Sequence, residues 1–366
     1  AILMSHIMAR AVPAPAHIPL MAQMTGLSTF HSTVMGASRK PGKVGHAVVT
    51  NLVVEGFQGE IVPVNPSDGE LLGQRFYPSL EEYGKPVEMS VITVPRENVL
   101  ETVKSSLKAR AKAVVVITAG FKEVDEEGAR LEAEVADLCK AAGARLMGPN
   151  SLGIINTHHK MNAAFACHTP RAGAISVVSQ SGALCSAILD WAAARNVGLA
   201  TLLSMGNKAD LDETDFLAAL TDDDKTKVIA GYLESIGSGP DFIRLAEAAA
   251  SIKPVVVLKA GTTAAGSKAA SSHTGALAGA DIAYGAAFKR AGVIRADTFE
   301  SLFDIATAFA MQPLPQGDRV AIITNAGGPG AMAADAIERT GMQVASLDHI
   351  IETTLQKKLP AAARVG

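Results

Sequence analysis

Short runs of β-branched apolar residues alternate along most of the chain with longer segments in which Ala, Leu, Lys and Glu recur at helical spacing. Segments with the helical pattern include residues 98–109 and 125–142, and Gly143 marks the end of the second. Strands that alternate with helices in this way predict βαβ units and a parallel sheet. The apolar runs of this first part lie at residues 32–35, 60–64, 89–94, 113–118 and 145–147.

A second series of apolar runs follows at residues 174–179, 198–204, 228–233 and 255–259. These runs are almost entirely apolar and lack the period-two alternation of a half-exposed strand. Strands of this kind are typical of sheets covered by helices on both faces. The sequence therefore predicts a second α/β domain with a parallel sheet.

Residues 311–318 contain two prolines and a glycine among polar residues and are typical of a linker. Beyond them we expect a strand at 319–324, the glycine-rich stretch 325–330 and a helix to about residue 340. About 50 residues are too few for an open α/β domain, because small domains bury little surface. The expected divisions are a tag or other non-family segment at 1–26, domains at 27–150 and 151–312, and an incomplete α/β domain at 317–366.

Composition narrows the function classes. The net charge of −3, the single Trp and the 4 Tyr offer neither the basic surplus nor the stacking platforms that nucleic-acid binding requires. The three cysteines show no C-x-x-C spacing, which argues against a disulfide framework or a zinc site and favours a reducing, cytoplasmic compartment. No apolar run reaches the roughly 18 residues needed to span a bilayer, so no membrane association is expected.

The first candidate site is the turn from Gly36 to Gly45, which includes Ser38, Gly42, Lys43 and Val44 and follows the first predicted strand. We expect a helix at 46–55 to begin there, and a helix N-terminus offers free N–H groups and positive potential to a phosphate. The spacing is not G-x-G-x-x-G, and the next strand ends in Asn65-Pro66 rather than in an acidic residue. A ligand-free structural turn remains the alternative.

The second candidate is Ser179-Gln180-Ser181-Gly182-Ala183, again a strand followed by small residues and a helix. Ser181 is a suitable N-cap, and the N–H groups of residues 181–183 can hold a phosphate. A helix cap without a ligand remains the alternative. Ser181 is not in a G-x-S-x-G frame, so a hydrolase nucleophile is poorly supported.

The third candidate is His273, which lies among Ser, Thr and Gly in the loop 259–279 and has no apolar face to pack. A neutral imidazole is a good phosphoryl acceptor near pH 7 when a carboxylate orients its other nitrogen, and Glu234 at a strand end suits that role. From the residues alone, an exposed loop histidine remains the alternative.

Two further groups of residues do not indicate a metal site. His158, His159 and His168 lie in a polar connection without Asp, Glu or Cys at ligand spacing. The acidic run 222–224 is more typical of a solvated turn at a helix end.

Taken together, these motifs resemble the NDP-forming (ADP-forming) acyl-CoA synthetases, relatives of the succinyl-CoA synthetase α subunit. The resemblance runs from about residue 32 to the C-terminus. The motifs occur in family order at 36–38, 41–45, 63–66, 148–151, 179–182, 272–275 and 324–330. Ser67 stands where many relatives have a lysine, so Lys40 or Lys43 is expected to reach the CoA phosphates instead.

The resemblance implies a Rossmann-like CoA-binding domain followed by a flavodoxin-like parallel-sheet domain. It implies that the first domain contacts CoA through Gly36, Ser38, Gly42, Lys43, Val44, Gly45, Asn65, Pro66, Val94, Pro95, Ile117, Thr118, Ala119, Gly120 and Asn150. It also implies that phosphate binds at Ser181, Gly182 and Ala183. His273 would accept the phosphoryl group, and Glu234 would orient the imidazole of His273.

The implied reaction converts acyl-CoA, ADP and phosphate into a carboxylic acid, CoA and ATP through an acyl phosphate and a phosphohistidine. ATP, ADP and Mg²⁺ then belong to an ATP-grasp module outside this sequence, on a β subunit or a further domain, in a dimer or heterotetramer. Two other readings stay open: a CoA-sensing regulatory module, as in fusions with protein acetyltransferases, and an NAD-dependent dehydrogenase.

Overall fold

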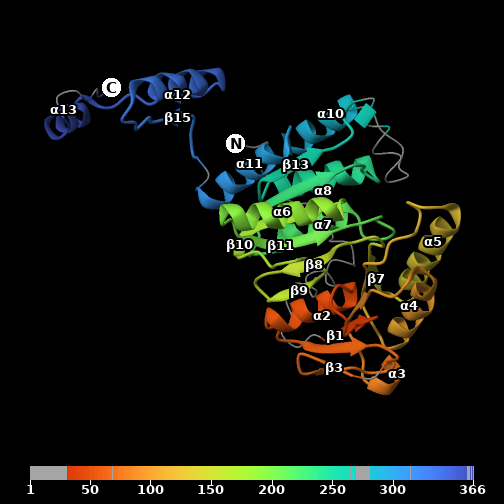
Figure 1. The fold of residues 1–366 in the computed structure, drawn as a ribbon. Helices are drawn as coiled ribbons and strands as arrows, with labels where there is room; N and C mark the ends of the chain where they lie inside the picture. Colours follow the sequence, from red (N-terminus) through yellow and green to blue (C-terminus); the bar gives the residue numbers. More distant parts are fainter. Residues whose placement is uncertain are drawn as a thin grey trace, which may run out of the picture. The chain divides into compact units, whose positions relative to one another are not determined.

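The computed structural model describes residues 31–67, 69–263, 265, 266, 268, 281–313, 315–360, 363 and 365. The chain divides into two compact units, with the break between Met311 and Gln312. Figure 1 shows the order of the elements along the chain. The first unit contains two sheets whose strands alternate with helices along the chain, so the predicted α/β fold class is confirmed. The exact domain boundaries stay a prediction.

The first sheet has five parallel strands in the order β2-β1-β5-β6-β7. The order reverses between β1 and β5, so the loops after these two strands open away from each other at their carboxyl ends, where α/β folds place ligands. The strands are β1 His31–Met35, β2 Glu60–Val64, β5 Met89–Ile92, β6 Ala113–Val116 and β7 Arg145–Met147. The smaller and helical elements are α2 Val44–Val54, β3 Glu70–Leu71, β4 Gln74–Arg75, α3 Leu80–Tyr83, η1 Arg96–Asn98, α4 Val99–Lys108 and α5 Glu126–Ala141.

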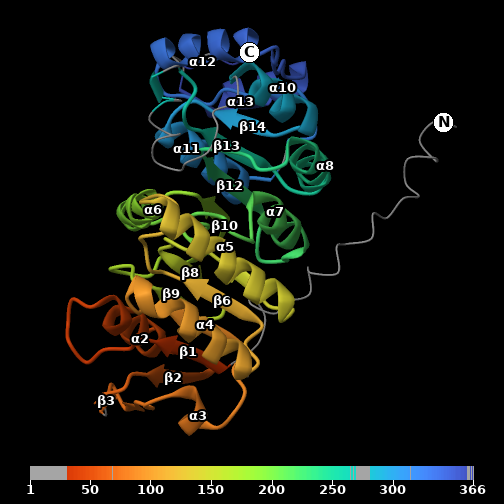
Figure 2. The same cartoon turned by 90° about the vertical axis from the view of Figure 1, so that its right-hand side faces the viewer.

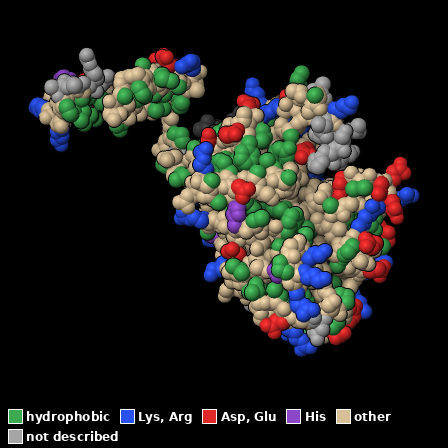
Figure 3. Space-filling view, viewed as in Figure 1, with side chains coloured by type: hydrophobic (Ala, Val, Ile, Leu, Met, Phe, Trp, Pro, Cys, Tyr) green, Lys and Arg blue, Asp and Glu red, His purple; other side chains and the backbone are tan. Residues whose placement is uncertain are grey.

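Successive side chains of these strands enter two different cores. Val34 packs with the α2 side, whereas its neighbour Met35 packs with α4 and α5. Both faces are therefore buried, which explains why the strands are apolar without alternation. Helices α4 and α5 lie side by side in both views of the ribbon (Figures 1 and 2). Their outer surface carries intermixed acidic and basic side chains (Figure 3).

The second sheet has seven strands in the order β14-β13-β12-β10-β11-β8-β9. Strands β10 to β14 are parallel, and an antiparallel hairpin of β8 and β9 joins at β11. The order reverses between β10 and β12. The strands are β8 Gly153–Asn156, β9 Met161–Ala164, β10 Ala172–Ser179, β11 Leu199–Ser204, β12 Val228–Leu233, β13 Val255–Lys259 and β14 Ile294–Ala296. The helices are α6 Gly182–Arg195, α7 Glu213–Asp222, α8 Gly239–Ala250, α10 Asp281–Ala291 and α11 Phe299–Met311.

Helices cover both faces of this sheet as well. Val177 of β10 packs with α6 and α11, where Phe303 is fully buried against Trp191. Val178 faces the other side, where Phe216 and other residues of α7, α8 and α10 pack. The apolar strands 174–179 to 255–259 are thus confirmed as the centre of a two-sided core.

The β8–β9 hairpin connects the two sheets. The sequence predicted no strands here: His158 and His159 of the expected polar connection lie in the turn between β8 and β9, and the two strands themselves are fully buried. The side chain of Asn51 in α2 donates hydrogen bonds to the carbonyls of Ala164 and Ala166, at 2.8 and 2.9 Å. Helix α2 therefore packs between the first sheet and the hairpin.

The second unit contains β15 Arg319–Val320, α12 Gly327–Arg339, β16 Gln343–Val344 and α13 His349–Lys358. Its two short strands are parallel. The predicted strand 319–324 is wrong beyond Val320, because β16 offers only two residues for pairing in the part of the unit that is described. The predicted helix begins earlier than expected, at Gly327.

Candidate functional site

One large cleft, with a volume of about 1510 Å³, lies within the first unit. The loops after β1, β5 and β6 line it from the first sheet, and the start of α6 lines it from the second. The predicted CoA residues at its wall are Gly36, Ser38, Lys43, Val44, Gly45, Asn65, Pro66, Val94, Pro95, Ile117, Thr118, Ala119 and Asn150. The predicted phosphate residues Ser181, Gly182 and Ala183 line the same cleft, whereas Gly42 and Gly120 do not.

The glycine-rich turn is shaped by a close approach of two glycines. Gly36 has a φ of +89°, and a Cβ on Gly45 would lie 2.1 Å from the carbonyl oxygen of Gly36. The N-cap residue of α2, Lys43, makes no side-chain capping bond. The first N–H groups of α2 are therefore free of a side-chain cap, beside the cationic side chains of Arg39, Lys40 and Lys43 in the cleft wall. This arrangement suits a diphosphate.

Asn65 holds the same turn from the end of β2. Its side-chain amide donates a hydrogen bond to the carbonyl of Ala37 at 2.7 Å, and its Oδ1 accepts one from the N–H of Ser67 at 2.8 Å. Asn65 was predicted as a ligand contact. Its hydrogen bonds show that it also fixes the backbone of the turn.

The loops after β5, β6 and β7 are tied to one another. The Thr118 hydroxyl donates to the carbonyl of Val94 at 2.6 Å, and the N–H of Asn150 donates to the carbonyl of Thr118 at 2.9 Å. Asn150 has a φ of +58°. These contacts place Asn150 beside the first sheet's loops and next to Ser151 and Leu152, which lead into β8.

The second half of the cleft is formed at the start of α6. The Ser181 hydroxyl accepts a hydrogen bond from the N–H of Leu184 at 3.2 Å, which confirms Ser181 as the N-cap. Just before it, the nearly buried Gln180 bridges to the loop after β12 by accepting from the N–H groups of Glu234 and Ser235. Both loops leave the second sheet at the point where its strand order reverses, between β10 and β12.

Glu234 is half-buried and follows β12 directly. Burial, together with the Glu234 carboxylate, raises the pKa of Tyr232 to about 12. Glu234 itself does not line the cleft. It lies one contact away, through Gln180, from the helix start that was predicted to bind phosphate.

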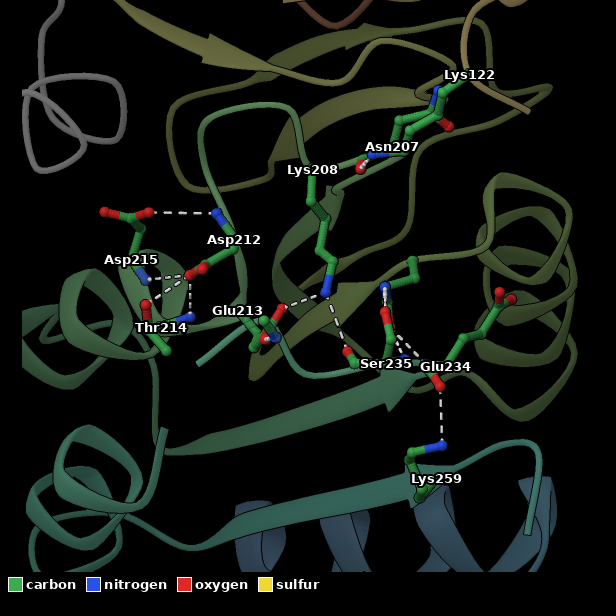
Figure 4. A network of polar contacts seen from close by, with 12 residues as sticks. Lys122, Asn207, Lys208, Asp212, Glu213, Thr214, Asp215, Glu234, Ser235 and Lys259 are labelled. Atoms are coloured by element: carbon green, nitrogen blue, oxygen red, sulfur yellow. Dashed lines mark hydrogen bonds and ion pairs between the residues drawn. The ribbon is translucent and has the colours of Figure 1, made fainter. Parts of the chain in front are cut away.

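A polar network not foreseen from the sequence runs beside these loops (Figure 4). Asn207, in the loop after β11, donates to Glu123 at 2.6 Å and to Glu132 at 2.8 Å. Its neighbour Lys208 contacts Glu213 and the loop that carries Glu234. Gly206 and Lys208 both have positive φ, so the Gly206-Asn207-Lys208 turn is tight, and its glycine is the sequence signal that could have indicated it.

His273 lies outside the described residues, so its predicted role is carried forward as a proposal. Within the described part of the chain, no group of three or more His, Cys, Asp and Glu residues is arranged to hold a metal ion. His158 contacts the carbonyl of Gly173 at 2.8 Å, and burial lowers the pKa of His159. His168 lies 3.6 Å from Asp190.

Comparison with known families matches both halves of the first unit. Residues 31–157 match a model described as a CoA binding domain, and residues 172–309 match one described as a succinyl-CoA ligase like flavodoxin domain. The chain is 42% identical over 315 residues to the acetate–CoA ligase [ADP-forming] I subunit alpha of Pyrococcus furiosus, covering 85% of this chain and 68% of that subunit.

The chain belongs to the family of ADP-forming acyl-CoA ligases.

A second relative of this ligase family, the acetate–CoA ligase [ADP-forming] I of Archaeoglobus fulgidus, is 44% identical over 328 residues. The match covers 90% of this chain and 47% of that protein, so the chain spans about half the length of this relative. Among solved structures, a dinucleotide forming acetyl-coenzyme A synthetase 1 of Ca. Korarchaeum cryptofilum, in complex with phosphate and ADP, superposes with a TM-score of 0.89. That match has 36% identity and covers 94% of this chain and 74% of that one.

No helix in the described residues is both long enough and apolar enough to cross a membrane.

Proposed function

We propose that this chain supplies the CoA site and the phosphorylated histidine of an ADP-forming acyl-CoA ligase, an acid–thiol ligase. One observation supports this most strongly. Helix α2 follows a strand of the first sheet and α6 follows a strand of the second, and the N-termini of both helices line the same cleft. An acyl-CoA bound at the first and a phosphate held at the second would have their reacting atoms in one space. Positioning of this kind accounts for much of the rate of phosphoryl and acyl transfer.

The cleft fits CoA in size and charge. Its volume of about 1510 Å³ is larger than that of common small-molecule pockets, which hold roughly 300 to 1,000 Å³. The CoA diphosphate would lie at Lys43, Val44 and Gly45, with Lys40 and Lys43 supplying the positive charge that Ser67 cannot. The remaining lining residues of the first sheet, together with Gly42 and Gly120 nearby, would shape the path to a thiol end at Asn150.

The chemistry proceeds in three steps. Phosphate attacks the acyl-CoA carbonyl, the C–S bond breaks, and an acyl phosphate and CoA form. His273 then takes the phosphoryl group through a new P–N bond and releases the carboxylate. In the last step ADP takes the group from His273, and ATP forms. Residues 181–183 would hold the phosphate during the first two steps, and Glu234 would orient the imidazole.

The nucleotide and its Mg²⁺ would bind to an ATP-grasp module on a partner subunit or a further domain. A relative named as a subunit alpha supports such a division. We place the complex in the cytoplasm, as a dimer or heterotetramer.

The proposal is tested with the full protein and its nucleotide-binding part, incubated with γ-labelled ATP and Mg²⁺. We expect an acid-labile, base-stable label on the chain that is absent from His273→Ala. Calorimetry with CoA and with NAD tests the other readings. CoA binding without any labelling would support a CoA-sensing module, and NAD binding without CoA binding would support a dehydrogenase.

A further inference from the structure

The segment Glu234-Ser235 is held through all four of its backbone polar groups. Both of its N–H groups donate to the side-chain oxygen of Gln180, the one from Ser235 at 3.0 Å. Gln180 is 8% exposed and directly precedes the N-cap of α6. One amide oxygen thus fixes two consecutive peptide units.

Two lysines hold the two carbonyls of the same segment. The Lys259 ammonium donates to the carbonyl of Glu234 at 2.8 Å, and the Lys208 ammonium donates to the carbonyl of Ser235 at 3.0 Å. In Figure 4 Lys208 approaches the segment from the loop after β11 and Lys259 from the end of β13, while the Glu234 side chain extends away from both. We call Gln180, Lys208 and Lys259 the Glu234 clamp.

Both lysines are removed from solvent. Lys259 is 5% exposed, and its ammonium lies 4.3 Å from the centre of the Tyr284 ring. Lys208 pairs with the buried Glu213 at 2.7 Å, and the other oxygen of Glu213 accepts a hydrogen bond from the N–H of Gly237 at 2.8 Å. Burying an ammonium costs free energy, and an apolar side chain of similar volume in its place often stabilises the fold just as well. The hydrogen bonds made by these lysines and by Glu213 fix backbone groups of residues 234–237.

The clamp also connects to the loops that line the cleft. Asn207, next to Lys208, contacts Glu123, which accepts hydrogen bonds from the N–H groups of Gly120 and Phe121 at 2.7 and 3.1 Å. The loop after β6 and the loop carrying Glu234 are thus linked by a continuous series of polar contacts. The link passes through the backbone between Asn207 and Lys208, so the contacts of Asn207 with Glu123 and Glu132 do not depend on the Lys208 ammonium.

We propose that Lys208 and Lys259 are positioning residues for phosphoryl transfer, which act by fixing the backbone that carries the Glu234 carboxylate. This inference rests on the function proposed above. Neither lysine is expected to touch CoA or phosphate. Removing either ammonium releases one carbonyl of the segment and lets the carboxylate move, and a displacement of about 1 Å can cost roughly 10²-fold in rate.

The test compares Lys259→Met and Lys208→Met with the wild type in the full ligase, and follows the rate at which labelled ATP phosphorylates the chain. Calorimetric titration with CoA verifies that each variant is folded, because neither lysine lines the cleft. We expect labelling to slow by about ten- to a hundredfold while the Kd for CoA changes less than about threefold. The second lysine variant keeps the test valid should one of the two fail to fold.

Lys253→Met is a matched control. Lys253 is also partly buried and also donates to two backbone carbonyls, those of Leu220 and Asp223, but it lies before β13, at the opposite end of the strand from Lys259. A variant at this position removes a similar set of bonds without touching residues 234–237. Its labelling rate should stay near that of the wild type.

A double-mutant cycle separates positioning from general destabilisation. If Lys259 acts through Glu234, Lys259→Met should add little in a Glu234→Gln background, because the carboxylate it positions is already gone. Independent, multiplying effects would overturn the inference, as would wild-type labelling rates in both lysine variants. A wild type that never becomes labelled would refute the proposed function itself, and the inference with it.

Discussion

The substitution Gly45→Ala tests the glycine-rich turn most directly. An added Cβ would stand 2.1 Å from the oxygen of Gly36 and 2.9 Å from the hydroxyl of Thr93, whereas real side chains keep such distances above 3.0 Å. The obstacle is backbone, so the start of α2 has to move away from the turn. Forcing an extra methyl group into a packed site costs about 1 to 3 kcal/mol.

The same movement would displace the N–H groups that we assign to the CoA diphosphate. Loss of one hydrogen bond to a charged group costs about 1.5 to 3 kcal/mol, and each 1.4 kcal/mol is about tenfold in Kd. We therefore expect Gly45→Ala to weaken CoA binding by roughly ten- to a hundredfold, measured by calorimetry, and to lower the urea midpoint of unfolding.

Gly239→Ala is the control, because Gly239 begins α8 and a Cβ there would meet nothing within 4 Å. It should change neither the Kd for CoA nor the stability by more than the uncertainty of the measurement. Wild-type CoA binding by Gly45→Ala would show that the close approach of the two glycines is not needed and that the diphosphate lies elsewhere.

Two further expectations concern the core and the thiols. Phe303 is fully buried, with its ring centre 4.6 Å from that of Trp191, so Phe303→Ala should reduce the free energy of unfolding by about 3 to 5 kcal/mol; an unchanged urea midpoint would contradict the described core. Burial raises the pKa of both Cys139 and Cys185 to about 12, while Cys167 is exposed. A thiol reagent at pH 8 should therefore modify Cys167 alone until the protein is unfolded. Because the folded pKa is raised, the unfolded chain loses these protons first, and stability should fall as the pH rises from about 9 towards 12; rapid reaction of all three thiols in the native protein would refute this.

The pattern of apolar residues was sufficient to predict the central strands of both sheets. Strands such as β6 and β13 are buried on both faces, so their sequences are almost continuous runs of apolar residues, mostly Val. Such short runs are typical of central strands in a parallel sheet. Strand ends were less exact: β5 stops at Ile92, two residues before the predicted end, because Thr93 and Val94 already belong to the loop at the cleft.

The β8–β9 hairpin could not be predicted in this way. Asn156 and Asn162 are buried in it, and polar residues in a short segment are typical of a loop. Local hydrogen bonds satisfy them: Asn156 accepts from the N–H of His159 at 3.2 Å, and Asn162 donates to Thr169 at 2.7 Å. Such compensation appears only once the fold brings the partners together.

In the candidate site, too, some residues could be predicted from the sequence and others could not. Residues in glycine-rich turns were predicted because small residues between a strand and a helix let a phosphate approach the free N–H groups of the backbone, and most of them do line the cleft. Lys208 and Lys259 were missed, because a lysine in a sequence is normally expected in solvent. Only the positions of the Glu234 and Ser235 carbonyls reveal why these two are buried.

The contact of α2 with the β8–β9 hairpin limits how modular this protein can be. A fragment excised at residue 150 would retain every strand of the first sheet, yet it would leave bare the α2 surface that Met161 and Ala163 cover, and the amide of Asn51 without its two acceptors. The sheet that we assign to CoA is thus not an interchangeable cassette. An exchange of this sheet between ligases would therefore have to include the β8–β9 hairpin.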